Sequence, residues 1–384
     1  MAAIFALELK RLGHEVHFVY ERELTDDQPS IATELQGHQI KTRHIVKMSS
    51  ELIPGLRHPL SEYISQERFE LVISSQLRDA APAMAAAHRQ RIKAVMMCMN
   101  LPHFSGSPVV KIIKHRVYQN AASKHADHVV VVAPAIEEEL VKNFRVAAAD
   151  ITVIPCGLDI ASIPAVDQGK VARLRVELGL QDASFVAVNL ARIHRQKGQD
   201  LLLEALRKLS ETKSLPVGFR MLFVGGPEND EGKRLMDQHI EATHRMGLDS
   251  YVRFVGFRDD YRNFLYIADA FILSSRWEGL PLVVLEAFAA NVPVLMTEYG
   301  KRFDRFRQGV DGFYAPNENP AALAAAIARL MELSPVERKA IGKNGHDFLQ
   351  KNLTLQSSLL KFGQLIDRVL APSTSLTPSS VPST

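Results

Sequence analysis

Cysteine and tryptophan are scarce in this chain, and long hydrophobic runs are absent from its sequence. Its 384 residues include two cysteines and one tryptophan. Cys98 and Cys156 lie too far apart to form a metal-ligand motif, and so few cysteines indicate a reducing compartment such as the cytoplasm. No apolar run reaches the ~18 residues of a membrane-spanning helix. The opening stretch MAAIFALELKRLGHEV is too short, and too soon charged, for a secretory signal.

A strong net charge is also lacking. Lys and Arg number 46 and Asp and Glu number 43, so the formal net charge is +3 and gives no indication of nucleic acid as a partner. Acidic residues are missing locally between Asp79 and Asp127, where the charged residues are Arg89, Arg91, Lys93, Lys111, Lys114, Arg116 and Lys124. This basic interval (89–124) is either a set of solvated helix faces or a surface that contacts anionic lipid or an acidic acceptor.

The sequence does contain short strands, rich in Val and Ile, that alternate with amphipathic helical patterns. No Gly-x-Gly-x-x-Gly run follows any of them, which argues against a nicotinamide dehydrogenase. The alternation predicts an α/β fold of two doubly wound units with parallel sheets. We expect strands at 15–20, 71–75, 94–99 and 128–132 in the first half, and at 185–191, 218–225, 251–257, 270–275 and 292–297 in the second.

Proline and glycine mark the expected boundary between the two units, in VIPCGLDI and the IPAVDQG that soon follows. Units joined by such a hinge would face each other across a cleft, with ligands at the carboxyl ends of the strands. A Ser/Thr/Pro-rich end predicts a disordered tail. The expected organisation is therefore a first domain at 1–160, a second at 161–350, a C-terminal helix at 351–370 that packs back on the first domain, and the tail at 371–384.

Two carboxylates stand in unusual places within the stretch EGLPLVVLE. Glu278 follows a predicted strand and precedes Gly279 and Pro281, so it is expected in a strand-to-helix loop beside a helix N-terminus that favours anions. Glu286 lies inside an apolar helix, where a carboxylate is costly unless donors reach it. Those donors could be water, a protein group, or a ligand with adjacent hydroxyls.

These residues resemble the Glu-x7-Glu signature of the group 1 retaining glycosyltransferases of GT-B fold. Four further pieces resemble that family in the expected order, together with the hinge VIPCGLDI. They are LKRLGHEVHFVY (9–20), VNLARIHRQKGQDLLLEAL (188–206), LFVGGPE (222–228) and VRFVGF (252–257). The resemblance covers roughly residues 5–365 and implies an acceptor-side first domain and a second domain that binds a nucleotide sugar.

The resemblance implies a function. Such enzymes move a sugar from a nucleotide diphosphate, here linked to UDP or GDP, to an acceptor and retain the anomeric configuration. The expected acceptor is a glycan or glycolipid of bacterial cell-surface polysaccharide or lipopolysaccharide synthesis, at the inner face of the cytoplasmic membrane. Peripheral contact with anionic lipid is expected, and no cofactor besides the donor. An alternative is a truncated, catalytically impaired protein that binds nucleotide sugars without turnover.

The resemblance also assigns roles to individual residues. Arg192 and Lys197 would grip the diphosphate, whose charge grows as the bond breaks. Glu278 would lie beside the donor sugar, Glu286 would bind the ribose hydroxyls, and His103 would help to bind the sugar. Backbone or base contacts are expected from Gly279, Leu280, Leu282, Gly225, Gly226, Phe257 and Arg258.

A metal ion is not expected. The acid pairs Asp26-Asp27 and Asp259-Asp260 are present, but no Asp-x-Asp follows a predicted strand. The phosphate charge would instead be met by cationic side chains and a helix N-terminus. Retention could proceed through a covalent carboxylate intermediate or by a front-face route, which the resemblance favours.

The chain departs from the family's pattern in three places. Relatives usually begin with a strand and a Gly-rich loop, whereas this sequence begins inside the helix that follows them. We therefore expect a first sheet with two unpaired strand edges, because the start is assigned too far downstream or because the chain is a truncated form. Cys156 stands where Asn is usual. The loop at 297–313 lacks the usual Gly-Gly-x-x-Glu, so no contacts are assigned to it.

Overall fold

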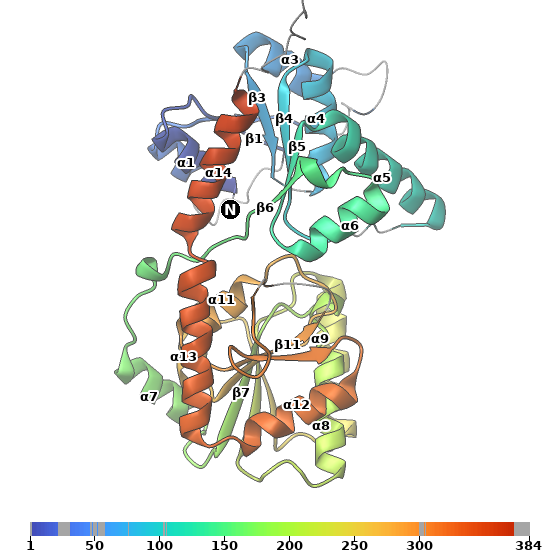
Figure 1. Cartoon of the computed structure of the whole chain (residues 1–384). Coiled ribbons are helices and arrows are strands. Elements are labelled where there is room, and N and C mark those ends of the chain that lie inside the picture. The colour runs from blue at the N-terminus through green and yellow to red at the C-terminus, as the bar shows by residue number, and fades with distance from the viewer. Residues whose placement is uncertain are drawn as a thin grey trace, which may run out of the picture.

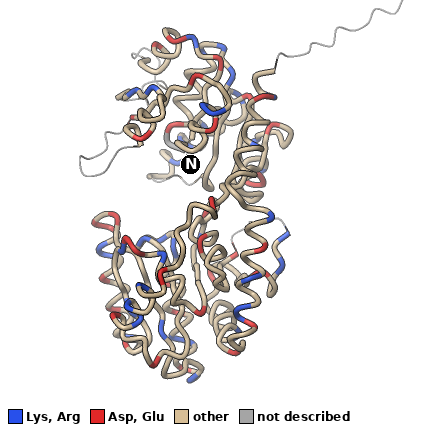
Figure 2. The backbone as a smooth tube through the Cα atoms, turned by 90° about the vertical axis from the view of Figure 1, so that its left-hand side faces the viewer, with Lys and Arg blue, Asp and Glu red and all other residues tan. Residues whose placement is uncertain are grey.

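Two α/β lobes joined by a narrow waist make up the chain (Figure 1). The structure is a computed structural model and describes residues 2–21, 31–46, 48, 52, 58–75, 77–102, 104, 106–298, 303 and 305–371. Seen from the side, basic and acidic residues intermingle on both lobes, in agreement with the small net charge (Figure 2). His103 and the tail beyond 371 lie outside the described residues.

The first lobe contains two parallel sheets. β1 pairs with β2, and a separate sheet has the order β3-β4-β5-β6. The described elements are α1 (Ala2–Arg11), β1 (His17–Tyr20), α2 (Ile31–Gly37), β2 (Lys41–His44), α3 (Pro59–Glu67), β3 (Leu71–Ser74), α4 (Leu77–Gln90), β4 (Lys93–Cys98), α5 (Pro108–Asn120), η2 (Ala121–His125), β5 (His128–Val131), α6 (Pro134–Phe144), η3 (Ala148–Asp150) and β6 (Ile151–Val153).

The gap expected in the first sheet is found between β1 and β3. Among the described strands, neither pairs on the side that faces the other. A cavity of about 470 Å³ lies there, lined by residues of both strands and by apolar side chains of the flanking helices α1 and α14 (Leu355–Leu370). His17 of β1 connects instead to α3, where its Nδ1 lies 2.8 Å from the Tyr63 hydroxyl. The lining includes Phe5, Leu9, Phe18, Leu71, Ile73 and Phe362.

The second lobe has one parallel sheet with the order β12-β11-β10-β7-β8-β9. β7 and β10 lie in the middle of the sheet. β8 and β9 extend it on the side of β7, and β11 and β12 extend it on the side of β10. Its elements are η4 (Ile160–Ser162), α7 (Gln168–Glu177), β7 (Phe185–Leu190), η5 (Arg195–Lys197), α8 (Gln199–Glu211), β8 (Phe219–Val224), α9 (Asp230–Arg245), β9 (Val252–Gly256), α10 (Asn263–Ile267), β10 (Ala270–Leu273), α11 (Leu282–Ala289), β11 (Val294–Glu298), β12 (Phe313–Pro316), α12 (Pro320–Glu332) and α13 (Pro335–Asn352).

Both faces of the second sheet are buried. Along β7, Val186 and Val188 pack with α7, α10 and α11 on one face, whereas Phe185 and Ala187 pack with α8 and α12 on the other. Side chains alternate between the faces of a strand, so a strand covered on both faces must be apolar throughout. This requirement explains why the Val- and Ile-rich runs of the sequence are continuous rather than alternating.

The sequence-based strand assignments miss three described strands. β2 reads KTRH and is exposed at alternate residues, so it has no apolar signal. β6 ends at Val153, the first residue of the stretch VIPCGLDI that we expected to be a hinge, and β12 follows the loop to which no role was assigned. Short or half-exposed strands depend on neighbours that a local pattern does not reveal.

The chain crosses between the lobes twice, and the two passages are hydrogen-bonded to each other. The Leu158 N–H donates to Leu353 O at 2.9 Å, and Leu355 N–H donates to Leu158 O at 3.0 Å. Beyond the second crossing α14 packs on the first lobe, where the rings of Phe5 and Phe362 lie 4.2 Å apart. The C-terminal helix is therefore part of the first lobe's core.

Ser358 connects the two passages. Its buried hydroxyl accepts the Gly157 N–H at 3.0 Å and donates to Pro155 O at 2.6 Å. We expect Ser358→Ala to lower the free energy of unfolding by about 1–3 kcal/mol, because a buried N–H loses its acceptor. Chemical denaturation measures this loss. The matched control is Ser357→Ala on the same helix, and equal midpoints for the two variants would contradict the assigned role.

Candidate active site

The site is built where the strand order of the second sheet reverses. β7 and β10 are neighbours there, and the chain leaves them toward opposite sides of the sheet. Loops that follow two such strands diverge and leave room for a ligand at their carboxyl ends. Lys197 comes after β7 and Glu278 comes after β10, so the topology brings together residues that are distant in sequence.

Lys197 is fixed by close packing of its loop on the end of β10. Gly198 has a φ of +61°, and a Cβ on it would lie 2.1 Å from Ser274 O, so only glycine fits. The Ser274 hydroxyl donates to Lys197 O at 3.0 Å. The backbone of the lysine is therefore held in place while its ammonium extends into the site.

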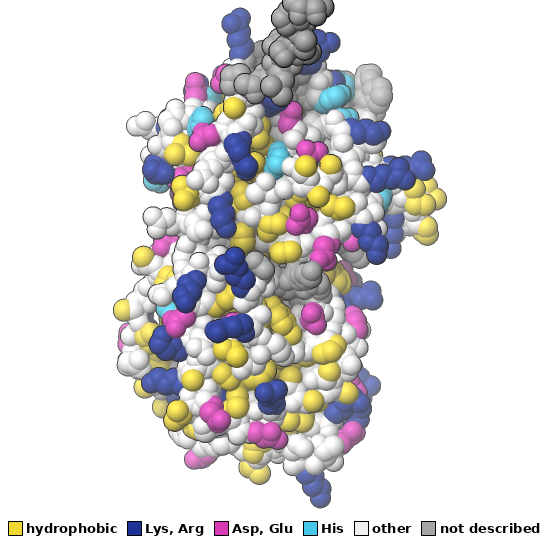
Figure 3. Space-filling view, viewed as in Figure 1, with side chains coloured by type: hydrophobic (Ala, Val, Ile, Leu, Met, Phe, Trp, Pro, Cys, Tyr) yellow, Lys and Arg dark blue, Asp and Glu magenta, His cyan; other side chains and the backbone are white. Residues whose placement is uncertain are grey.

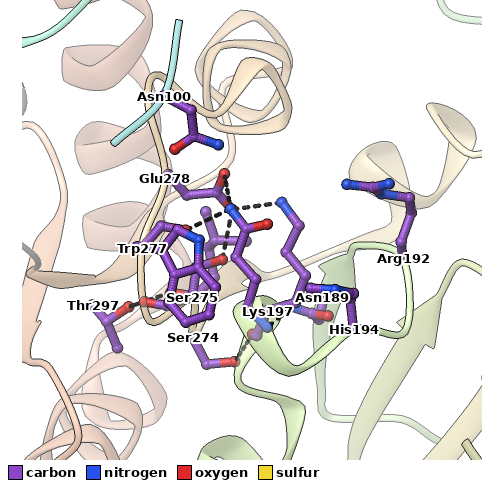
Figure 4. A network of polar contacts seen from close by, with 12 residues as sticks. Asn100, Asn189, Arg192, His194, Lys197, Ser274, Ser275, Trp277, Glu278 and Thr297 are labelled. Carbon is purple, nitrogen blue, oxygen red and sulfur yellow. Dashed lines mark hydrogen bonds and ion pairs between the residues drawn. The ribbon is translucent and has the colours of Figure 1, made fainter. Parts of the chain in front are cut away.

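Glu278 is buried, with 6% of its surface exposed, and is surrounded by donors. The Lys197 ammonium contacts Oε1 at 2.5 Å and the Ser275 hydroxyl contacts the same oxygen at 2.7 Å. The Gln196 amide reaches Oε2 at 3.3 Å (Figure 4). A buried charge with these partners is satisfied without water. Neither Gln196, which precedes Lys197, nor Ser275, three residues before Glu278, was predicted to belong to the site.

Arg276 fixes the loops that carry Glu278 and Lys197 relative to each other. Its guanidinium holds Asp200 through two bonds of 2.8 and 2.7 Å and donates to Arg195 O at 2.9 Å. Burial alone would raise the pKa of Asp200, but the hydrogen bonds and charge of Arg276 hold that pKa below its usual value. This planar, bidentate arrangement suits arginine and is not available to lysine. No local motif marked Arg276 as part of the site.

Arg192 stands apart from the contact between Lys197 and Glu278. Figure 4 shows its guanidinium at the side of the site, separated from the lysine. It forms an ion pair with Glu228 in which both side chains are more than half exposed. Exposed pairs contribute about 0–1 kcal/mol, so this contact would not prevent Arg192 from turning toward an anionic ligand.

Glu286 lies on α11 with 7% of its surface exposed. Three donors reach its Oε1: the Tyr261 hydroxyl at 2.9 Å and the Arg262 guanidinium at 3.0 and 2.9 Å. Burial, followed by the charge of Glu286, raises the pKa of Tyr261. The apolar setting of this acid is thus balanced by protein donors, which is one of the alternatives that its sequence left open.

The first glycine after β8 is needed for close backbone packing. Gly225 has a φ of +136°, and a Cβ on it would lie 2.1 Å from Ala191 O, next to Arg192. A Cβ on Gly226 would lie 3.4 Å from the Cβ of Phe257. Phe257 itself is 77% exposed. Gly225 therefore determines how closely the β8 loop approaches the segment that carries Arg192, whereas a side chain on Gly226 would make ordinary contact with Phe257.

Arg258 is engaged in ion pairs, with Asp260 at 2.8 Å and with Glu177 at 2.6 Å. Its guanidinium also lies 5.6 Å from the Phe264 ring. A role in binding a base would have to compete with these contacts and stays a prediction.

The loop that follows Glu278 touches the first lobe. A Cβ on Gly279 would lie 1.9 Å from Met99 O, so the absence of a side chain permits this contact. Leu280 packs against the cores of both lobes. Figure 4 shows Asn100, from the loop after β4, above Glu278. No local sequence pattern marked Asn100 as a residue of the site. Pro281 occupies the N-cap position of α11, and Leu282 begins the helix half-exposed.

Among the described residues, no group of three or more His, Cys, Asp and Glu side chains converges in a way that could hold a metal ion. The 470 Å³ cavity lies in the first lobe, lined by residues other than Glu278 and Lys197. We place the site by its polar contacts rather than by that cavity.

Comparison with known proteins identifies the family. The model of glycosyl transferases group 1 matches residues 171–348. The model of glycosyltransferase family 4 matches residues 2–162. The chain belongs to the group 1 glycosyltransferases.

Curated relatives align with this glycosyltransferase, and two of them do so over more than half of their own length. One is the UDP-Gal:alpha-D-GlcNAc-diphosphoundecaprenol alpha-1,3-galactosyltransferase of Escherichia coli, 24% identical over 73% of this chain and 72% of the relative. Another is the D-inositol 3-phosphate glycosyltransferase of Actinosynnema mirum, 29% identical over 63% of this chain and 58% of the relative.

Solved structures share the fold of this glycosyltransferase. HepE of Anabaena, in complex with UDP, aligns with a TM-score of 0.78 and 19% identity over 96% of each chain. Sucrose-phosphate synthase of Thermosynechococcus elongatus aligns with a TM-score of 0.73 and 20% identity over 95% of this chain and 91% of that one. The fold is GT-B, with two Rossmann-like domains, as the sequence predicted.

Gly279 offers a test of the contact between the domains. Gly279→Ala would place a methyl group against the Met99 backbone, so we expect unfolding to become easier by about 1–3 kcal/mol, the usual cost of overpacking. Thermal and chemical denaturation measure this change. Gly37→Ala is the control, since a Cβ there meets no atom within 4 Å. If Gly279→Ala proved as stable as that control, the contact between the domains would not be tight.

Proposed function

We propose that the enzyme is a retaining glycosyltransferase that moves a hexosyl group from a UDP-sugar to a glycan or glycolipid of bacterial surface polysaccharide or lipopolysaccharide synthesis. The observation that carries the proposal is the buried contact of Lys197 with Glu278 at the reversal of strand order. UDP is favoured over GDP because the Escherichia coli relative is named for UDP-Gal and HepE was solved with UDP. The donor would need no cofactor.

The cations at the site suit a diphosphate. Lys197 is 14% exposed at the end of its loop, and Arg192 is half-exposed across from it. Negative charge accumulates on the departing UDP as the glycosidic bond breaks, and fixed cations stabilise it most where water is excluded. A diphosphate at this position would compete with Glu278 for the lysine ammonium. Lys197 would then neutralise phosphate, and Glu278 would be available to the sugar.

The carboxylates would have separate roles. Glu278 would accept sugar hydroxyls and oppose the positive charge that develops at the anomeric carbon. Glu286 would accept hydroxyls of the ribose. Among the described residues, the donors that contact Glu286 are Tyr261 and Arg262, and both contact its Oε1. Hydroxyl donors could therefore approach Oε2. Gly279, Leu280 and Leu282 would direct backbone N–H groups toward the donor. Gly225, Gly226, Phe257 and Arg258 would lie nearer the base.

Retention without a metal ion fits this set of residues. In a front-face reaction the leaving phosphate takes the proton of the acceptor hydroxyl while that oxygen bonds to the anomeric carbon. Such a route requires cations on the phosphate more than a nucleophile below the sugar. Lys197 and Arg192 supply that charge. His103, outside the described residues, would contact the sugar from the first domain.

The acceptor would be reached at the cytoplasmic face of a membrane. The Escherichia coli relative is named for an acceptor that carries a diphosphoundecaprenol lipid. Among the described residues, no helix combines the length and apolar character needed to cross a bilayer. The contact that we propose with the membrane is peripheral.

Carboxylate substitutions test the division of roles. Glu286→Ala should weaken UDP binding about 10- to 100-fold, since it removes charged hydrogen bonds to the ribose. Glu278→Ala should leave UDP affinity within about threefold and lower the turnover of UDP-sugars about 10²- to 10³-fold.

Calorimetry with UDP and a hydrolysis assay over a panel of UDP-sugars report the two effects. Glu332→Ala, on the exposed end of α12, is the control. Equal UDP affinity in wild type and Glu286→Ala would refute the ribose assignment, and UDP binding without turnover in the wild type would refute the proposed enzyme.

Metal independence has its own test. Activity should change less than about twofold after treatment with a chelator, because side-chain cations already neutralise the diphosphate. Arg192→Ala and Lys197→Ala should each lower turnover about 10²- to 10³-fold, and added Mg²⁺ should not restore it. Loss of wild-type turnover with chelator, and its recovery with Mg²⁺, would show that a metal is required.

A further inference from the structure

The first two turns of α5 project from the first domain with apolar side chains in solvent. Val109, Ile112 and Ile113 are 66%, 57% and 55% exposed, and Val110 is 39% exposed. Figure 1 shows α5 extending sideways beside α6. A single exposed apolar side chain is ordinary on a protein surface, whereas a contiguous group on one short helix indicates a binding surface.

The charged side chains on α5 itself are all basic. At 100° per residue, the four exposed apolar side chains share one side of the helix, and Lys111 and Lys114 lie on the other. Arg116 follows one turn later, and the sequence has no acid between Asp79 and Asp127. Figure 3 shows hydrophobic and basic side chains together at this projection. An apolar face bordered by lysines is typical of helices that lie in the interface of a membrane.

The second half of α5 is anchored, so the projection is a fixed part of the domain. The His115 ring stacks on Phe144 at 4.4 Å. Tyr118 is buried against the same phenylalanine, and its hydroxyl donates to the Cys98 sulfur at 3.1 Å. Membrane binding through a helix that is already ordered costs little conformational entropy.

We propose that the apolar face of α5 inserts into the interface of a membrane that contains anionic lipid. The projecting shape and the positive charge support this partner. A convex tip with two lysines can enter a headgroup layer without a matching groove, while anionic headgroups neutralise its charge. A protein partner would instead have to provide both a cavity and acidic groups. Lipid binding would then need only the basic residues of α5, and not the rest of the basic interval (89–124).

The location of α5 connects the membrane to the active site. The chain leaves β4, passes Met99 and Asn100 at the contact with Gly279, and then enters α5. A membrane held at α5 would therefore lie beside the acceptor side of the site. This consequence rests on the proposed function, whereas the membrane contact itself does not.

Vesicle co-sedimentation of the full chain tests the proposal. Wild type should pellet with vesicles of phosphatidylcholine mixed with phosphatidylglycerol, and less with phosphatidylcholine alone. Ile112→Glu combined with Ile113→Glu should reduce binding at least about tenfold, because the inserted apolar area is lost. Lys111→Gln and Lys114→Gln should each reduce it about fivefold and weaken the preference for anionic lipid.

Matched substitutions on the second domain provide the controls. Val336→Glu and Lys339→Gln lie at exposed positions of α13 and should leave vesicle binding unchanged. Hydrolysis of a UDP-sugar in solution should be equal in wild type and in the α5 variants, which shows that they are folded and separates this test from that of the enzymatic function. The proposal would be overturned if wild type did not bind anionic vesicles, or if the α5 variants bound them as well as wild type does. Self-association that needs Ile112 and Ile113 and occurs without lipid binding would also overturn it.

Discussion

The buried carboxylate of Glu278 is the constraint on which the site depends. A charge with 6% exposure must be paired, and its partners come from both loops that diverge at the strand reversal. Lys197 can supply that charge only because Gly198 allows its loop to rest on Ser274. Arg276 then prevents the two loops from separating. A buried ion pair adds little net stability, so this arrangement is better explained by the precise positions that it gives to charged groups.

The contact between the domains depends on backbone more than on side chains. At Gly279 the second domain meets the Met99 carbonyl without an intervening Cβ, and at Ser358 one hydroxyl holds both passages of the chain. Leu280 adds an apolar contact that belongs to both cores. These groups help to determine the relative position of the domains. Motion between domains is the usual expectation unless their interface is large and hydrophobic.

The sequence predicted the parts of this architecture that have strong periodicity or a motif. The apolar runs of β7 and β10 and the loop position of Glu278 follow from local pattern. The partners of Glu278 and Glu286 do not, because Gln196, Ser275, Tyr261 and Arg262 are ordinary polar residues whose meaning depends on the fold. β2 was missed because a four-residue, half-exposed strand has no apolar pattern. His103 lies outside the described residues, so its role stays a prediction.

The two domains contribute unequally to the candidate active site. The cations and carboxylates assigned to the donor, apart from His103, come from the second domain, whose sheet is continuous and buried on both faces. The first domain contributes the backbone near Met99 and the projecting α5, and its sheet is divided beside a 470 Å³ cavity. Unpaired strand edges and missing contacts weaken local packing, and regions of weak packing open first. Donor binding should therefore be less sensitive than acceptor binding to conditions that loosen the first domain. The charged site is built in the domain best able to hold it rigid.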